Sequence, residues 1–216
     1  MIDPRSFLKA GQDFHGHKCP ALPLGLRVGA AAMNALGVDR AKDGQLAAIL
    51  ELGEAHCAHC FGDGIQMITG CTFGKGNLRT LPYGKFGLTL VDRATGRAVR
   101  VVPRAEVQAA QRQASFFKDY RSQGIAASAV PDEVVDPLVE RVLSLSDEVL
   151  LVVGEVFEAP VERRVETFDS FTCDWCGEMV IETYGRVVGD RKVCIPCAEA
   201  IRARVGRQPM ARGGVR

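Results

Sequence analysis

The central helix of the fold is encoded by residues 20–37, which read PALPLGLRVGAAAMNALG. Apolar side chains recur along this stretch at near-helical spacing, and Gly37 stands where helices commonly end in a left-handed residue. We therefore predict a helix over residues 22–36. Its small residues Gly25, Gly29 and Ala32 weaken the helix but let another backbone approach closely. We expect it to be buried against a neighbouring helix or subunit.

The segments around this helix predict an α+β domain. Strands cluster in one region of the chain, with helices before and after, which favours an α+β core over a parallel βαβ array. The expected elements are a short helix at 5–10, a buried strand at 45–52, a short helix at 62–70, a hairpin at 85–102 turning at Thr95 and Gly96, helices at 103–124 and 132–145, and a strand at 150–153.

Composition predicts a folded chain of two domains. The 216 residues are 47% hydrophobic and 25% charged, which is typical of globular proteins. We expect a core domain at 1–160, a small module at 166–205 and a basic tail at 206–216. The net charge of +1 gives no general attraction to nucleic acid or to an anionic membrane. No apolar run has the length of a signal peptide or a membrane span, so we expect a cytoplasmic protein.

Four cysteines near the end of the chain form the most specific motif. Cys173 and Cys176 are followed by Cys194 and Cys197, which is the spacing of a four-cysteine zinc site. Two such pairs supply four thiolates to one tetrahedral ion and leave no open position, so we predict a structural zinc in a zinc-ribbon module. A rubredoxin-like iron site and two disulfides are the alternatives, and a reducing cytoplasm argues against disulfides.

The other cysteines and all four histidines lie between residues 15 and 71. Cys19 precedes a helix N-terminus, where the dipole favours a thiolate. A mixed His and Cys set with fewer than four fixed ligands would leave room for water or substrate, whereas the alternative is that each residue is an ordinary buried side chain. The set comprises His15, His17, Cys19, His56, Cys57, His59, Cys60 and Cys71.

Two further motifs are weaker. The segment GCTFGKGN at 70–77 resembles a phosphate-binding loop, but it is one residue short and has Gly76 in place of the magnesium-binding Ser or Thr. Its glycines and Lys75 could still cradle an anion. Cys57 and Cys60 have the spacing of a dithiol oxidoreductase, but the βαβ context of that class is missing.

Several long strings give the chain a resemblance to a known family: FHGHKCP at 14–20, GLR at 25–27, CFGDGIQ at 60–66, TGCTFGKGN at 69–77 and YGK at 83–85. They resemble the FmdE family, which takes its name from a component of formylmethanofuran dehydrogenase, over about residues 5–160. By this resemblance His17, Cys19, Cys60, Asp63 and Cys71 fall on the family's cleft positions. The family usually has Gly at Ala21 and small or variable residues at positions 56, 57 and 59.

The resemblance also implies a function. It implies a homodimer with an α+β core, linked to one-carbon metabolism that depends on molybdenum or tungsten, without itself carrying the pterin-metal centre. We expect an accessory metalloprotein in which His17, Cys19, Cys60 and Cys71 hold a second ion, with His15, His56, Cys57, His59, Asp63 and Lys75 nearby.

Two other functional classes stay open. One is a thiol- or metal-dependent enzyme, or a dithiol redox protein, that uses His17, Cys19 and Cys60. The other is a zinc module that binds nucleic acid or a protein partner through the arginine-rich tail. A solvated chain end explains that tail more simply, so nucleic acid is not expected.

Overall fold

The structure, a computed structural model, describes residues 1–54, 59–161 and 167–205. The predicted cleft residues His56 and Cys57 lie outside these ranges. The chain divides into two compact units, Met1–Val161 and Glu162–Arg216, here called the core unit and the C-terminal unit. Each is described separately.

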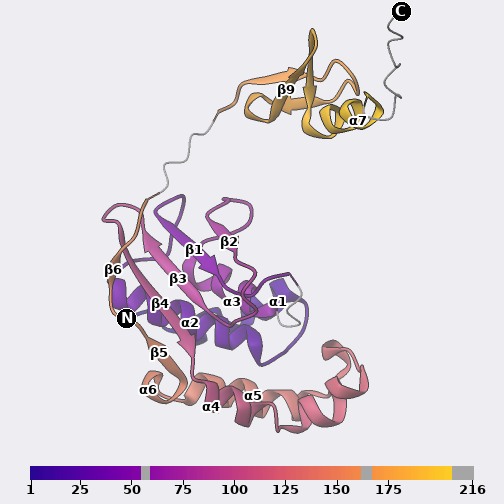
Figure 1. Cartoon of the computed structure of the whole chain (residues 1–216). Helices are drawn as coiled ribbons and strands as arrows, with labels where there is room; N and C mark the ends of the chain where they lie inside the picture. Colours follow the sequence, from indigo (N-terminus) through magenta and orange to yellow (C-terminus); the bar gives the residue numbers. More distant parts are fainter. Residues whose placement is uncertain (55–58, 162–166, 206–216) are drawn as a thin grey trace, which may run out of the picture. The chain divides into compact units, whose positions relative to one another are not determined.

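The core unit is built on one mixed sheet (Figure 1), whose strand order is β2-β1-β3-β4-β5, with β6 also paired to β4. Only β1 and β2 run parallel, and every other pair is antiparallel. The predicted hairpin is confirmed as β3 and β4, which align Leu88 with Val101. The strands are β1 (Leu46–Leu50), β2 (Leu78–Thr80), β3 (Leu88–Asp92), β4 (Arg97–Pro103), β5 (Leu151–Val153) and β6 (Phe157–Glu158).

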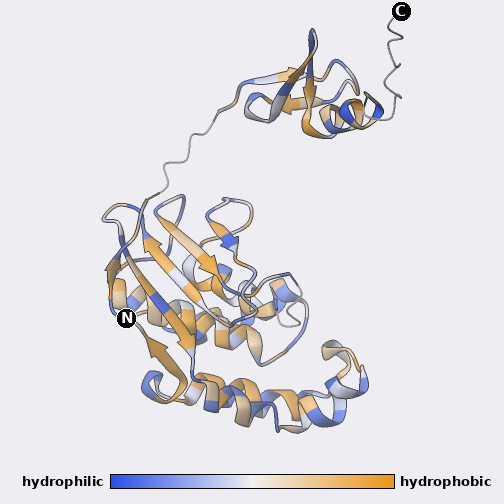
Figure 2. Cartoon of the chain, in the orientation of Figure 1, coloured by the Kyte–Doolittle hydropathy of each residue, from blue (hydrophilic) through white to orange (hydrophobic). Residues whose placement is uncertain are grey.

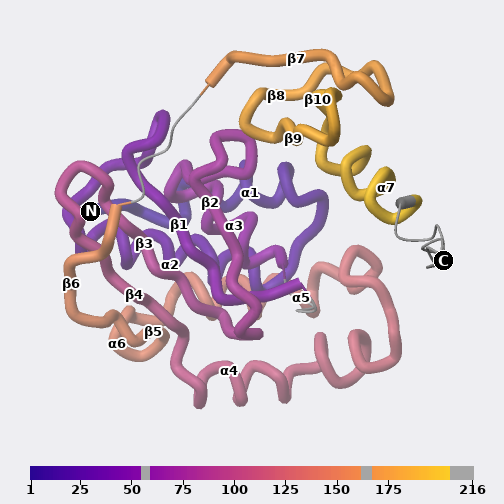
Figure 3. The backbone as a smooth tube through the Cα atoms, turned by 45° about the horizontal axis from the view of Figure 1, so that its top comes forward, coloured from indigo at the N-terminus to yellow at the C-terminus, as the bar shows by residue number. Residues whose placement is uncertain are grey.

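Helices cover one face of this sheet (Figure 3), with α2 lying along β3 and β4. Burial alternates along β1, where Leu46, Ala48 and Leu50 point into the core, as expected for a sheet covered on one side. The apolar side chains of the central strands make these ribbons the most hydrophobic part of Figure 2. The helical elements of the core unit are η1 (Pro4–Phe7), α1 (Leu8–His15), α2 (Ala21–Leu36), α3 (Cys60–Thr69), α4 (Ala105–Gln111), η2 (Phe116–Tyr120), η3 (Arg121–Gln123), η4 (Ala127–Ala129), α5 (Asp132–Ser144) and α6 (Asp147–Leu150).

The closest packing in the core unit joins α2 to α3. A Cβ placed on Gly25 would lie 2.1 Å from the carbonyl oxygen of Phe61, and one on Gly64 would lie 2.2 Å from that of Leu22. Glycine is required at both positions because no side chain fits between the backbones. The expected close approach of a second backbone to this helix is therefore confirmed.

The helix predicted over 103–124 is interrupted. It begins as α4 but ends at Gln111, and the chain continues through a π-helical turn, η2, and a 3₁₀ turn, η3. No proline or glycine lies at the break. Phe116 is buried here and its ring meets that of Phe117 edge-to-face, with centroids 4.9 Å apart. The packing of these two rings explains why the chain leaves the α-helical path.

The C-terminal unit holds two small hairpins and one helix. Strand β7 (Ser170–Thr172) pairs with β8 (Met179–Ile181), and β9 (Gly185–Val188) pairs with β10 (Arg191–Cys194). A 3₁₀ turn, η5 (Glu182–Tyr184), joins the hairpins, and α7 (Ile195–Val205) follows β10. The prediction included a hairpin between the cysteine pairs but not this helix. Among the described helices of both units, none combines the length and the apolar character that a membrane crossing needs.

Candidate metal centres

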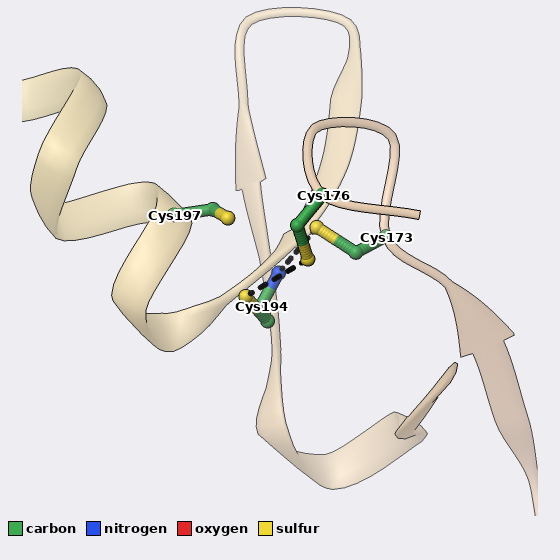
Figure 4. Close-up of side chains that lie close together, drawn as sticks. All are labelled: Cys173, Cys176, Cys194 and Cys197. Atoms are coloured by element: carbon green, nitrogen blue, oxygen red, sulfur yellow. Dashed lines mark hydrogen bonds between the residues drawn. The ribbon is translucent and has the colours of Figure 1, made fainter. Parts of the chain in front are cut away.

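The four C-terminal cysteines converge on one point (Figure 4). Cys173 and Cys176 come from the loop between β7 and β8, Cys194 ends β10, and Cys197 lies in the first turn of α7. Their sulfur atoms all lie within 4.8 Å of one another. Gly177, at φ 76°, turns the chain tightly after the first pair. The structure thus brings together all four residues predicted from their spacing.

This geometry fits a tetrahedral zinc ion. Four thiolates at about 2.3 Å from one zinc would be separated by about 3.8 Å, and the sulfurs of Cys176 and Cys194 are 4.0 Å apart. The backbone N–H of Cys194 also donates to the Cys173 sulfur at 3.3 Å. Burial opposes ionisation of Cys173, but N–H groups of neighbouring residues outweigh it and lower the pKa of Cys173 to about 6. A thiolate, the form that binds zinc, is therefore favoured.

The unit's apolar interior is too small to explain its fold. Its buried residues are three of the cysteines with Val193 and Ala198, and only a few partly buried side chains pack around them. A core of this size does not normally hold a domain together without a metal or disulfides. The described cysteines form no disulfide. The cysteine cluster thus supplies what the apolar core lacks.

A second group of ligand atoms lies in the core unit. His15 ends α1, Gly16 turns the chain at φ 89°, and Cys19 immediately precedes α2. As a result one nitrogen of His15, one of His17 and the sulfur of Cys19 lie within 4.8 Å of one another. We call these three residues the cleft cluster.

The hydrogen bonds of His15 leave one ring nitrogen able to bind an ion. Its Nδ1 lies 2.7 Å from Oδ2 of Asp63. Where the carboxylate is ionised it can only accept, so Nδ1 donates and Nε2 keeps its lone pair, as in metal sites that orient a histidine through a carboxylate. That Nε2 lies 3.2 Å from Nε2 of His17. Two imidazole nitrogens on one tetrahedral zinc would lie about 3.3 Å apart.

The surroundings also favour the forms of His17 and Cys19 that bind metal. Burial, followed by the charges of His15 and Arg121, lowers the pKa of His17, which favours the neutral ring. A hydrogen bond with Cys60 is the largest cause that lowers the pKa of Cys19, to about 6, against the effect of burial. Backbone N–H groups of Leu22 and Ala21, at the start of α2, act in the same direction. The expectation that the helix N-terminus promotes ionisation of Cys19 is confirmed.

Cys60 adjoins the cleft cluster without belonging to it. Its hydrogen bond with Cys19, together with burial, raises the pKa of Cys60. The pair therefore holds one thiolate and one thiol when no ion is present. As the first residue of α3, Cys60 is positioned by the close packing of α2 and α3. It is a candidate for a fourth ligand.

Two residues predicted for this site lie elsewhere. Cys71 is fully buried in the apolar core, where burial raises the pKa of its thiol, and it is not among the grouped ligand atoms of the described residues. The ammonium of Lys75 donates to the carbonyls of Ala41 and Lys42, so it is held to the backbone beside the loop and does not face the cleft cluster. His59 does line the cleft, while its Nε2 lies 2.9 Å from the carbonyl of Gly53.

A cavity of about 840 Å³ opens onto the cleft cluster. Its opposite wall comes from residues 108–128, which the sequence did not indicate as part of the site. The missed lining residues carry aromatic, amide and guanidinium groups on an unbroken helical pattern, so only the observed interruption turns them toward the histidines. They include Phe86, Gln108, Gln111, Arg112, Phe116, Phe117 and Arg121.

Comparison with known proteins identifies the family. A family model described as "FmdE, Molybdenum formylmethanofuran dehydrogenase operon" matches residues 14–152. The chain belongs to the FmdE family. The match spans α2, α3, the sheet and the cleft cluster, and it ends before the C-terminal unit.

Two relatives extend this comparison. The crystal structure of an FmdE-like protein of tungsten formylmethanofuran dehydrogenase, from Syntrophus aciditrophicus, is 20% identical, with a TM-score of 0.61 over 93% of this chain and 97% of that chain. At this identity the likeness shows the fold. A "Probable S-adenosyl-L-methionine-binding protein" of Archaeoglobus fulgidus is 33% identical over 211 residues, which are 94% of this chain and 55% of the relative. The chain therefore spans about half the length of that relative.

Proposed function

We propose that this FmdE-family chain is an accessory metalloprotein that holds an accessible metal ion in the cleft cluster and a structural zinc in the C-terminal unit. The observation that carries the proposal is the grouping of His15, His17 and Cys19, with Asp63 orienting His15. Three protein ligands leave one coordination position for Cys60, water or a bound molecule. When bound, the ion would act there as a Lewis acid.

The C-terminal site differs from the cleft in the number of ligands. Four cysteines complete the coordination of one zinc, so that ion has a purely structural role. The cleft cluster is built from two histidines and one cysteine beside a large cavity, and an ion held there can meet a second molecule. The two sites therefore have separate roles in one chain.

The family supports a cellular setting for the protein. Its name places related genes with a molybdenum formylmethanofuran dehydrogenase, and we propose that this chain works beside such a molybdenum or tungsten oxidoreductase in one-carbon metabolism. We further propose a cytoplasmic homodimer that does not bind nucleic acid. Light scattering on the purified chain tests the dimer, since a monomer at micromolar concentration would rule it out.

A second candidate function follows from the pair of Cys19 and Cys60. A thiolate at Cys19 that shares a hydrogen bond with a protonated thiol is the arrangement of a nucleophilic or redox-active cysteine. In this case the cleft needs no ion, and His17 would serve as the base. The two functions differ in whether the purified protein contains one ion or two.

The name of the Archaeoglobus relative raises S-adenosylmethionine as a ligand. We do not propose it for this cavity, because the lining includes Arg112 and Arg121 but no carboxylate, and these charges disfavour a sulfonium cation. Calorimetric titration with S-adenosylmethionine tests this view, and micromolar binding lost in Phe117→Leu would overturn it.

Metal content of the full-length protein tests the main proposal. Purified wild type should contain two metal ions per chain by elemental mass spectrometry, and His17→Ala and Cys19→Ala should each contain one. Cys71→Ala is the matched control, because Cys71 is a buried cysteine outside the cluster, and it should keep both ions. A wild type with one ion, and with a Cys19 thiol that alkylates readily, would support the thiol function instead.

A further inference from the structure

The cavity beside the cleft cluster is much larger than a metal site needs. Its volume of about 840 Å³ falls in the range of pockets that enclose an organic ligand of drug size. One side holds the histidines and cysteines, and the other side is formed by residues 108–128, here called the pocket wall. The chemistry of the pocket wall therefore indicates which kind of molecule would lie over the ion.

The charge of the pocket wall is positive. Arg112 and Arg121 line the cavity, and the lining contains no aspartate or glutamate. Across the described ranges, neither guanidinium forms an ion pair, although Arg121 donates to the carbonyl of Ile125. Arg121 also lies close enough to His17 for its charge to lower the pKa of that ring. Planar guanidinium groups bind carboxylate and phosphate through paired hydrogen bonds, and Gln108 and Gln111 add further donors.

The remainder of the lining is apolar and partly aromatic. Phe116 and Phe117 belong to the π-helical turn η2, and Phe86 lies on the loop before β3. Single π-helical turns within helices occur frequently at functional sites. Here the turn presents two phenyl rings side by side, and Leu24 of α2 extends the apolar surface. Such a surface suits a planar ring or a similar flat apolar body.

We propose that the cavity binds an organic anion with a planar aromatic body, whose carboxylate or phosphate meets Arg112 and Arg121 and whose ring lies against the phenyl rings of the pocket wall. The inference rests on the proposed function, in which the cleft cluster holds an ion at the inner end of the cavity. Its own support comes from separate side chains, so the two can be tested independently.

Calorimetric titration of the zinc-loaded full chain tests the inference. The probes are 2-naphthoate, its neutral counterpart 2-naphthamide, and inorganic phosphate. We expect 2-naphthoate to bind about tenfold or more tightly than 2-naphthamide, because charge-assisted hydrogen bonds are stronger than neutral ones. It should also bind more tightly than inorganic phosphate, which lacks the ring. Equal affinity for the two naphthalene compounds, or for phosphate and 2-naphthoate, would overturn the proposal.

Substitutions in the pocket wall assign the binding to this cavity. Arg121→Gln and Arg112→Gln should each weaken 2-naphthoate about tenfold and change 2-naphthamide by about twofold at most. Phe117→Leu should weaken both compounds. Arg141→Gln is the control, because Arg141 is an exposed arginine on α5 outside the cavity. If both arginine substitutions weaken the two compounds equally, the arginines are merely structural and the proposal is wrong.

Metal analysis of the same samples separates this inference from the proposed function. A protein that contains the cleft ion but does not prefer the anion contradicts the inference alone. A protein that prefers the anion but contains no cleft ion contradicts the proposed function alone. Because Arg121 also bonds the backbone at Ile125, Arg112→Gln provides a second variant should Arg121→Gln fold poorly.

Discussion

Glu51 and Arg100 form an ion pair at the end of the central strand β1. Two hydrogen bonds of 2.7 Å join the guanidinium to both carboxylate oxygens, and the Glu51 side chain is only 8% exposed. Neighbouring Gly87 leaves room for it, since a Cβ there would lie 2.8 Å from the Glu51 carboxyl. A carboxylate in this position depends on its partner, because a buried charge without one is costly.

This pair predicts a dependence of stability on pH. Arg100→Met should lower the free energy of unfolding by about 1–2 kcal/mol at pH 7. The hydrogen bond with Arg100 is the main cause that lowers the pKa of Glu51 from 4.5. A carboxyl with a lowered pKa in the folded state contributes stability above its unfolded pKa and loses it as pH falls through the folded value. The cost of the substitution should therefore shrink below about pH 4.

Urea unfolding followed by circular dichroism at pH 7 and at acid pH measures the effect. Arg141→Met, on the exposed side of α5, is the control and should change stability by less than about 0.5 kcal/mol at either pH. An equal cost of Arg100→Met at both pH values would show that the arginine acts through packing and not through its charge.

Single residues also show the limit of prediction from sequence. The spacing of Cys173, Cys176, Cys194 and Cys197 predicted their grouping, because a short gap forces both thiolates of a pair to one side. The spacing of Cys71 carried no such information. Its side chain is buried in the core, while His15 occupies the place beside His17 and Cys19. Which way a side chain points depends on packing that distant residues determine.

At the scale of elements, the packing of α2 on α3 connects the fold to the cleft. Cys19 precedes α2 and Cys60 begins α3, so the approach of these two helices sets the contact between the two cysteines. Gly25 and Gly64 permit that approach. A side chain at either position would push the helices apart near the ligand atoms.

We expect Gly25→Ala and Gly64→Ala each to destabilise the core unit by about 2–3 kcal/mol, because the added methyl group would overlap a backbone carbonyl. Both variants should also retain less metal in the cleft. Chemical unfolding and elemental analysis measure the two effects. Gly74→Ala is the matched control, because its Cβ would meet nothing within 4 Å. Wild-type stability in Gly25→Ala would show that the helices can separate without cost.

The elements were predicted well where a local pattern determines them. Leu22, Leu26 and Met33 at helical spacing predicted α2, and the glycines beside them predicted its close packing. The interruption after Gln111 could not be predicted, because no proline or glycine marks it and it depends on the burial of Phe116. Strand β2 was also missed, since its three residues are mostly exposed and show no apolar alternation.

For the whole molecule, the two units should respond differently to removal of metal. The chain has a single tryptophan, Trp175, which lies between Cys173 and Cys176 in the C-terminal unit. The guanidinium groups of Arg191 and Arg204 lie within 6 Å of its ring centroid. Its fluorescence therefore reports on that unit alone, while circular dichroism reports mainly on the larger core unit.

A strong zinc chelator should shift the emission of Trp175 to longer wavelength while most of the circular dichroism signal remains. The reason is that the C-terminal unit needs its ion to fold and the core unit has its own apolar interior. Cys176→Ser should show the shifted emission without chelator, and Cys71→Ala should resemble wild type. Simultaneous loss of both signals would show that the core unit also depends on metal for its fold.

The wall and the inner end of the cavity are encoded in different parts of the chain. The ion-binding side comes from residues 15–19 and 59–60, and the pocket wall comes from residues 108–128. Mutations in one segment can therefore alter which compound is accepted and leave the coordinating atoms in place. Among homologues, ligand preference can diversify through this single stretch without loss of the ion.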